Sequence, residues 1–354
     1  MPLAPDSEEP CRRPAVALGS PLERKKSPGP TVRSAAPGRV QVWGTRERPE
    51  HAPCRRYCLD PGQVPLRSYP VIILRVRVVS WNVHFRGPEA AKRQGDLLRE
   101  LAPDLMLLQE LNPGSSAILA DAAGADWIIR AIDLRAAEPD DTPVRRRGVA
   151  IAGRGLLFCR SWLLDKIRLP ERILLIETQT EGTPFVAVSY HAPPGVNWGI
   201  VKPQQAVAFA SWLSRQNGPL LLGADANTPL IDTPDFANTR THWHTGRKRL
   251  RGELGDDLLF GPDKKHDLED ALRRWLAFHP DEMARLRAKP SGPLAITHRT
   301  GKRKNSPGTD RRFDSVWVSH HWIVRHVEHL YDKGIEAGSD HAPIVVDVEL
   351  TAQI

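Results

Sequence analysis

The feature that most constrains the fold is a series of short apolar runs rich in β-branched residues, separated by turn residues. These runs lie at residues 71–80, 104–111, 148–152, 173–178, 185–190, 220–223, 313–319 and 343–350. Their length and composition predict strands that are buried on both faces. Apolar residues recur at helical spacing at 88–101 and 203–215, and less regularly near 267–276 and 280–288. Buried strands with a few intervening helices indicate an α/β fold.

Composition allows a large core. The chain has 354 residues, of which 40% are hydrophobic and 26% charged, so global disorder is excluded. The longest apolar stretch, residues 71–81, is interrupted by Arg75 and Arg77 and is too short to span a bilayer. The four cysteines form no disulfide or zinc pattern, and Cys54 and Cys58 are interpreted as free thiols. We therefore expect a soluble, cytoplasmic monomer.

The first 70 residues differ from the rest. They contain 13 of the 32 prolines and carry 12 basic against 7 acidic side chains, without a sustained period of 2 or 3.6. Such a segment cannot bury enough apolar surface to offset chain entropy. We predict a disordered tail over residues 1–70 and a folded catalytic domain over residues 71–354. The tail is either a basic arm or an extension without function.

Polar residues stand where the apolar runs end or begin. Asn82, Glu110, His191 and Asp225 each follow a run, and Asn227 lies two places further on. Asp314 heads a run, and Asp340 and His341 precede the last one. Side chains of this kind are costly to bury unless they are paired or bind a metal, and α/β folds gather their sites at strand ends. Carboxylates and amides without a cysteine cluster favour a hard cation such as Mg²⁺, and the histidines are candidate acids and bases.

Six segments in this order resemble the endonuclease/exonuclease/phosphatase superfamily, over roughly residues 74–350. They are SWNVHF at 80–85, LLQEL at 107–111, YHAPPG at 190–195, GADAN at 223–227, RRFDSVWV at 311–318 and GSDHAP at 338–343. HDLEDALR at 266–273 is similar to a late segment of the same family. One departure is Ala226, which is small where members commonly have a bulky apolar residue.

The resemblance implies a four-layer α/β/β/α sandwich of two mixed sheets, and Mg²⁺- or Mn²⁺-dependent hydrolysis of a phosphoester. It implies Glu110 as the principal metal ligand, supported by Asn82 and Asp340. It also implies that His341, held by Asp314, acts on the attacking water. Asp225 and Asn227 would hold or protonate the scissile phosphate. His191 would contact the phosphate or the leaving oxygen, donating as an imidazolium.

The substrate class is open at this point. A nuclease acting on DNA or RNA is favoured, because residues 228–313 carry 18 basic against 12 acidic side chains. Neither a membrane-binding amphipathic helix nor an apolar hairpin is evident in the sequence, which counts against a lipid substrate. We expect this long segment to form a loop and helices over the site and to set substrate choice. Candidate substrate-binding residues are Arg247, Lys248, Arg249 and Arg251. The alternatives are a phosphodiesterase or phosphatase for a lipid head group, inositol phosphate or other small ester, and a binding module that lacks activity. His84, His242 and His244 are interpreted as solvated or structural.

Overall fold

The computed structural model describes residues 72–84, 87–136, 147–194, 198, 200–241, 251–289, 291–301 and 308–352. The side chains of residues 72, 251–254, 351 and 352 are not described. The predicted tail, residues 1–70, and the predicted substrate-binding residues Arg247, Lys248 and Arg249 lie outside the described residues, as do His242 and His244. Arg251 is the first residue of a helix, but its side chain is not described. The division into tail and catalytic domain therefore stays a prediction.

The first sheet has the strand order β13-β14-β1-β2-β4-β3. Its strands are β1 (Ile72–Asn82), β2 (Leu105–Leu111), β3 (Trp127–Arg130), β4 (Gly148–Gly153), β13 (Trp322–His329) and β14 (Ile344–Ala352). β1 and β2 are parallel, and every other pair is antiparallel. The first and last strands of the described chain therefore lie side by side, with Val78 opposite Val346.

The second sheet has the strand order β5-β6-β7-β8-β12-β9. Its strands are β5 (Leu157–Trp162), β6 (Ile173–Thr180), β7 (Thr183–His191), β8 (Leu220–Asp225), β9 (Glu269–Asp270) and β12 (Asp314–Val318). Only β7 and β8 are parallel within it. A separate antiparallel pair consists of β10 (His298–Thr300) and β11 (Thr309–Arg311). Both large sheets are thus mixed.

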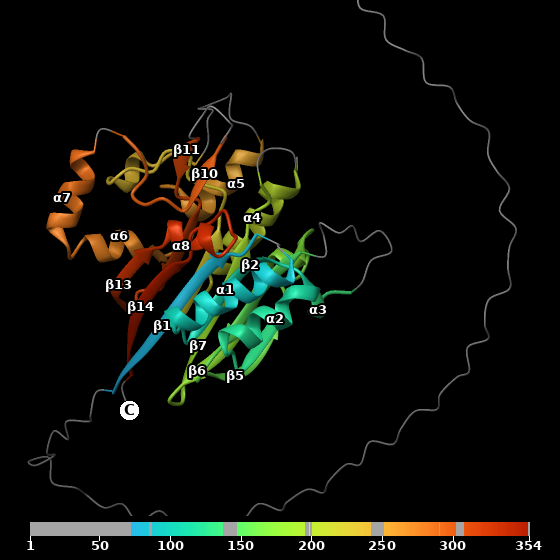
Figure 1. The fold of residues 1–354 in the computed structure, drawn as a ribbon. Coiled ribbons are helices and arrows are strands. Elements are labelled where there is room, and N and C mark those ends of the chain that lie inside the picture. The colour runs from blue at the N-terminus through green and yellow to red at the C-terminus, as the bar shows by residue number, and fades with distance from the viewer. Residues whose placement is uncertain are drawn as a thin grey trace, which may run out of the picture. The chain divides into compact units, whose positions relative to one another are not determined.

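Helices cover the outer face of each sheet (Figure 1). α1 (Pro88–Leu101) and α2 (Pro113–Ala123) pack on the first sheet through Leu98 and Leu119. α4 (Val201–Leu213) and α5 (Arg251–Phe260) cover the second sheet, where Phe209 and Leu259 share a cluster with Tyr190. The shorter elements are α3 (Ala131–Leu134), η1 (Pro170–Arg172), η2 (Phe236–Asn238), α6 (Ala271–Leu276), α7 (Pro280–Ala288) and α8 (Tyr331–Glu336). None of the described helices is long and apolar enough to span a membrane.

Alternation along the strands explains the layers. In β1, Val76 and Val78 point into the core between the sheets, whereas Val79 and Trp81 point toward α1 and α2. Because both faces of the strand are covered, the sequence reads as a nearly continuous apolar run. The predicted four-layer α/β/β/α sandwich is confirmed.

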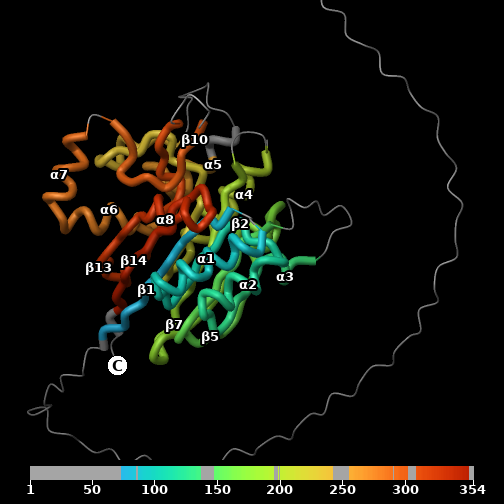
Figure 2. Tube along the Cα trace, viewed as in Figure 1, coloured from blue at the N-terminus to red at the C-terminus, as the bar shows by residue number. Residues whose placement is uncertain are grey.

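The segment that follows β8 is the least regular part of the domain. It lies at one end of the sandwich, yellow to orange in Figure 2. The helix predicted near 267–276 is shorter than expected, since residues 269–270 form edge strand β9 and Asp270 caps α6 by accepting a hydrogen bond from the Leu272 amide at 3.0 Å. Asp270 also pairs with the buried Arg312 at 2.7 Å. The helix therefore begins only at Ala271, because Asp270 serves as its N-cap and as an ion-pair partner.

The two sheets approach closely at Gly223 in β8. A Cβ atom at this position would lie 2.6 Å from Ser80 Oγ and 2.8 Å from Leu107 Cβ, both of which belong to the opposite sheet. We predict that Gly223→Ala destabilises the domain by about 1–3 kcal/mol, because the added methyl group overpacks the core. Gly218→Ala is the matched control, since Gly218 is exposed and has open space at its Cβ position. Urea unfolding of both variants checks this, and equal midpoints would contradict it.

Candidate active site

Three predicted site residues form one row across the second sheet. His191 at the end of β7 lies opposite Asp225 at the end of the parallel strand β8. Asp225 in turn lies opposite Asp314, the first residue of the antiparallel strand β12. An antiparallel strand begins at the edge where its neighbour ends, so Asp314 joins residues that terminate their strands. All three side chains are buried.

The first sheet contributes Asn82 and Glu110. Asn82 ends β1 and is paired in register with Gln109 of the parallel strand β2. Glu110 follows Gln109 at a bulge, where the register between β2 and β4 shifts. Its φ angle is 56°, which is unfavourable for a glutamate by roughly 1–2 kcal/mol. The bulge re-aims the Glu110 carboxylate, which remains 25% exposed while its neighbours in the strand are buried.

Asp340 and His341 lie in a tight turn just before β14. Ser339 fixes this turn: its hydroxyl donates to Asn82 O at 2.6 Å and accepts from the His341 amide at 3.0 Å. The Trp81 indole donates to His341 O at 2.9 Å. These bonds tie the turn to the end of β1, so both residues face the same edge as Asn82.

Polar contacts join the two sheets at this edge. Asn82 Nδ2 donates to Asp225 Oδ2 at 2.8 Å, and His341 Nδ1 donates to Asp314 Oδ2 at 2.8 Å. His191 Nε2 lies 3.6 Å from Glu110 Oε1 and 3.5 Å from Asp225 Oδ2. Asn227, with a φ angle of 51°, donates through its side chain to Ala192 O and through its amide to Asp225 Oδ1, both at 3.1 Å. The eight residues predicted as catalytic or metal-binding thus lie at one edge of the sandwich.

Negative charge dominates this edge. Burial and the charge of Asp314 raise the pKa of Asp225 to about 7. Burial lowers the pKa of His341, but the charges of Asp314 and Asp225 outweigh it and raise that pKa to about 10. Within the described part of the chain, Asp314 Oδ1 is buried without a hydrogen-bond partner. Carboxylates that repel one another, with an oxygen left unsatisfied, form a donor set that fits a divalent cation.

Arg172 is a site residue that the sequence analysis missed. It lies at the end of η1, directly before β6, and its Nη1 donates to His191 Nδ1 at 3.0 Å. Since a guanidinium can only donate, His191 Nδ1 is an acceptor and the ring proton is on Nε2. Burial and the charge of Arg172 lower the pKa of His191 well below 6.5. His191 is therefore a neutral donor here, and the expectation that it acts as an imidazolium is not supported by this geometry.

Two further histidines flank Asp340. The ring of His84, interpreted from the sequence as solvated or structural, contacts Asp340 Oδ1 through Nδ1. His298 Nδ1 donates to Asp340 O at 3.0 Å, and the His298 ring stacks on His341 with centroids 4.4 Å apart. Burial raises the pKa of Asp340, but the hydrogen bond from His84 and the charge of His341 outweigh it and lower that pKa to about 2. The sequence gives no periodic signal for His298, which begins a three-residue strand.

The predicted metal ligands are not drawn together into one compact set. Among the described residues, the groups with metal-ligand spacing are Asp225, Asp314 and His341, and His298, Asp340 and His341. Glu110 belongs to neither group, and the amide oxygen of Asn82 accepts from the His84 amide at 2.9 Å. The assignment of Asn82, Glu110 and Asp340 to one ion therefore stays a prediction.

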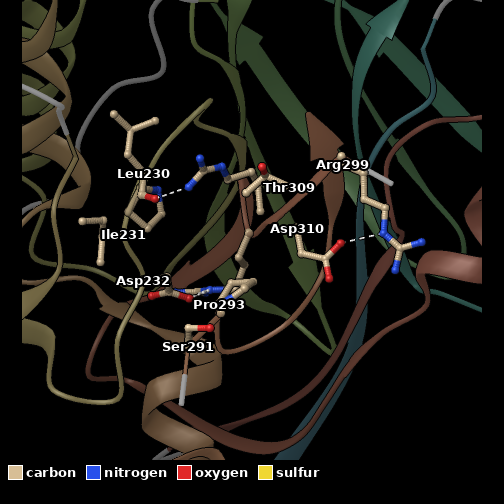
Figure 3. A pocket seen from close by; sticks show the side chains of 13 residues that line it. Leu230, Ile231, Asp232, Ser291, Pro293, Arg299, Thr309 and Asp310 are labelled. Carbon is tan, nitrogen blue, oxygen red and sulfur yellow. Dashed lines mark hydrogen bonds and ion pairs between the residues drawn. The ribbon is translucent and has the colours of Figure 1, made fainter. Parts of the chain in front are cut away.

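A hollow of about 710 Å³ is lined by segments that adjoin predicted site residues in the sequence (Figure 3). Its wall includes residues 229–232, which follow Asn227 closely in sequence, and residues 308–312, which precede Asp314. Arginine side chains line it, but acidic groups accompany them: Arg299 pairs with Asp310 at 2.6 Å, and Arg312 with Asp232 at 2.7 Å. Part of the segment expected over the site thus forms a wall of mixed charge, whereas α6 packs on β12 and β13.

Replacing Arg172 tests the assigned form of His191. In the wild-type protein without metal, we expect ¹⁵N shifts of a neutral ring protonated at Nε2, persisting below pH 6.5. In Arg172→Met, the donor to Nδ1 and its charge are lost, so a mixture of tautomers and a higher pKa are expected. Arg172 lies over the Trp198 ring, and Arg160 lies over the Trp162 ring in the same way. Arg160→Met is therefore the control, because Arg160 is exposed and pairs with Glu177 instead of His191. An ordinary titration of His191 in the wild-type protein would contradict the assignment.

Solved structures with the same fold have low sequence identity to this chain. D. rerio TDP2 complexed with single strand DNA product is 15% identical, with a TM-score of 0.52 over 77% of this chain and 98% of that chain. A Bacteroides vulgatus endonuclease/exonuclease/phosphatase is 14% identical, with a TM-score of 0.53 over 78% and 99%. One from Beutenbergia cavernae is 21% identical, with a TM-score of 0.50 over 78% and 72%. These similarities establish the fold alone.

A search of curated protein sequences finds no match. The model of the endonuclease/exonuclease/phosphatase family, in contrast, matches residues 79–341, which extend from the end of β1 to His341. Of the eight residues predicted as catalytic or metal-binding, seven lie inside the matched range, and His341 is its last residue. The chain therefore belongs to the endonuclease/exonuclease/phosphatase family, whose members are metal-dependent phosphoesterases.

Proposed function

We propose that this protein is a divalent-metal-dependent phosphodiesterase that hydrolyses DNA or RNA. The observation that carries the proposal is the pair of contacts between the sheets, Asn82 to Asp225 and His341 to Asp314. They bring carboxylates, amides and imidazoles to one edge, which is the combination that phosphoester hydrolysis requires.

The His341–Asp314 pair orients the imidazole. With Nδ1–H donated to Asp314, the other ring nitrogen, Nε2, lies 4.0 Å from Asp340 Oδ1. From this position His341 can orient the attacking water or donate to a phosphate oxygen. Asp314 keeps the ring in one orientation and stabilises its positive charge.

Asp225 and His191 provide proton-handling groups on the opposite sheet. Asp225 accepts hydrogen bonds from Asn82 and from the Asn227 amide, which fix its carboxylate near the His191 Nε2–H. In the proposal, Asp225 holds or moves a proton beside the scissile phosphate, and Asn227 helps to place it. His191 donates from Nε2 as a neutral ring, to the phosphate or to the leaving oxygen.

Glu110 would hold the metal, with Asn82 and Asp340 in support. Mg²⁺ or Mn²⁺ fits these oxygen donors, and when bound it supplies charge neutralisation and polarisation of the phosphoryl group. The strained φ angle of Glu110 supports its role, because backbone strain of this kind persists mainly where function requires a particular direction.

A nucleic acid is the substrate that the charge distribution favours. Residues 228–313, part of which lines the hollow of mixed charge, carry 18 basic against 12 acidic side chains in total. TDP2, which shares the fold, has been seen with a single-stranded DNA product, and this adds an analogy at the level of the fold. A lipid head group or another small phosphoester is the alternative that the assays below separate.

Removing the charge of Glu110 tests the metal assignment. We expect Glu110→Gln to lower Mg²⁺-dependent hydrolysis by at least about a hundredfold, because the amide keeps the shape but loses the charge that holds the ion. Glu181→Gln is the matched control: Glu181 also has a positive φ angle, 46°, but it is exposed in the β6–β7 turn. Turnover and melting temperature should be measured for both. Undiminished turnover in Glu110→Gln would reject the assignment.

Salt dependence tests the substrate class. If the basic segment holds a phosphate backbone, log K should fall with log salt by roughly 0.7–0.9 for each phosphate contacted. Replacing Arg247, Lys248, Arg249 and Arg251 together by alanine should flatten this slope and raise KM more than it lowers kcat. A matched quadruple replacement on exposed outer surfaces should leave the slope unchanged; its positions are Lys92, Arg160, Arg215 and Arg325.

The same assay should compare single- and double-stranded DNA and RNA with sphingomyelin and bis-p-nitrophenyl phosphate. Nucleic acid turnover with a steep salt dependence supports the nuclease. If only a small ester is turned over, with a shallow salt dependence and no effect of the quadruple variant, the nuclease proposal is contradicted. That result would support an enzyme that acts on a lipid head group or another small phosphoester.

A further inference from the structure

His298 and His341 form a cross-strand pair beside Asp340. The two residues lie directly opposite one another in an isolated antiparallel bridge, so their side chains project from the same face. Their rings stack at an interplanar angle of 23°. His298 has no role in the hydrolysis proposed above, and its stacking on His341 therefore requires its own explanation.

In each of the two rings, Nδ1 is already held by a hydrogen bond. His298 donates Nδ1–H to the Asp340 carbonyl, and His341 donates Nδ1–H to the Asp314 carboxylate. Histidines that bind metals commonly donate the other ring nitrogen to a backbone carbonyl or a carboxylate in this way, since the bond fixes the tautomer and raises the basicity of the ligand nitrogen. In both residues Nε2 is consequently the atom available for a ligand.

We propose that His298, Asp340 and His341 form a second metal site, which selects ions that prefer imidazole, such as Zn²⁺, over Mg²⁺. One ligand atom from each residue lies within 4.8 Å of the others. Ligands of a single tetrahedral Zn²⁺ lie roughly 3–3.5 Å apart, whereas His341 Nε2 lies 4.0 Å from Asp340 Oδ1, so the side chains must approach one another when the ion binds. Two imidazoles and one carboxylate with an open fourth position are a donor set typical of zinc.

The site shares Asp340 with the predicted Glu110 ion but differs from it in its two imidazole ligands, since Glu110 is not among the residues with this spacing. It is accessible, since the Asp340 side chain is 38% exposed. A bound Zn²⁺ would take the place of a proton on His341 Nε2, so that this atom could no longer serve the hydrolysis. Zn²⁺ should therefore inhibit the Mg²⁺-dependent reaction, a consequence that rests on the proposed function, whereas binding itself does not.

Calorimetric titration of the untagged full chain with ZnCl₂ tests the site, together with the visible spectrum of bound Co²⁺. We expect binding of one ion that is weakened by at least about 10–100-fold in His298→Asn, because loss of a ligand costs no less than loss of an outer-shell partner. His320→Asn, which removes an exposed histidine two residues after β12, and Glu110→Gln should bind Zn²⁺ as the wild type does. Melting temperatures of the variants establish that each is folded.

Equal Zn²⁺ affinity in His298→Asn and the wild type would overturn the site, as would loss of the ion in Glu110→Gln. Absence of Zn²⁺ binding to the wild type would overturn it as well. If His298→Asn does not fold, ¹⁵N shifts of the wild-type imidazoles decide the question: both Nε2 signals, of His298 and His341, must move on Zn²⁺ addition. If Glu110→Gln retains hydrolysis, this result contradicts the proposed function but not the zinc site.

Discussion

The polar bonds between the two sheets are the constraint on which the candidate site depends. Asn82 reaches Asp225, and His341 reaches Asp314, so a carboxylate row on one sheet is held against an amide and an imidazole on the other. These groups are buried, and each would be costly without its partner. The close approach at Gly223, two residues before Asp225, keeps the sheets near enough for the bonds to form.

The fold follows from the sequence where strands are buried on both faces. Such strands give long apolar runs, and β1, β2, β6, β7, β8 and β14 were predicted close to their observed bounds. β5 and β13 were not predicted, because they lie at or near sheet edges and mix charged residues with apolar ones, as in Trp322–His329. β13 also contains a bulge between Val324 and His326, which breaks the alternation that would mark a strand.

Site residues were predictable where they interrupt an apolar run, as at Asn82, Glu110, His191 and Asp225. Arg172 heads a strand as Asp314 does, and the same rule applied to the starts of antiparallel strands would have found it. His298 could not be found, since it is brought to His341 by a bridge between distant segments. The protonation of His191 was likewise inaccessible from sequence, because it depends on burial and on Arg172.

The central claim is that this edge binds a divalent cation through Glu110 for phosphodiester hydrolysis. Anomalous diffraction from crystals soaked in Mn²⁺ tests it most directly. The account predicts a peak roughly 2.2 Å from a carboxylate oxygen of Glu110, at the edge shared by Asn82 and Asp225. It would be contradicted by the absence of a peak at Glu110 under conditions in which the protein hydrolyses its substrate.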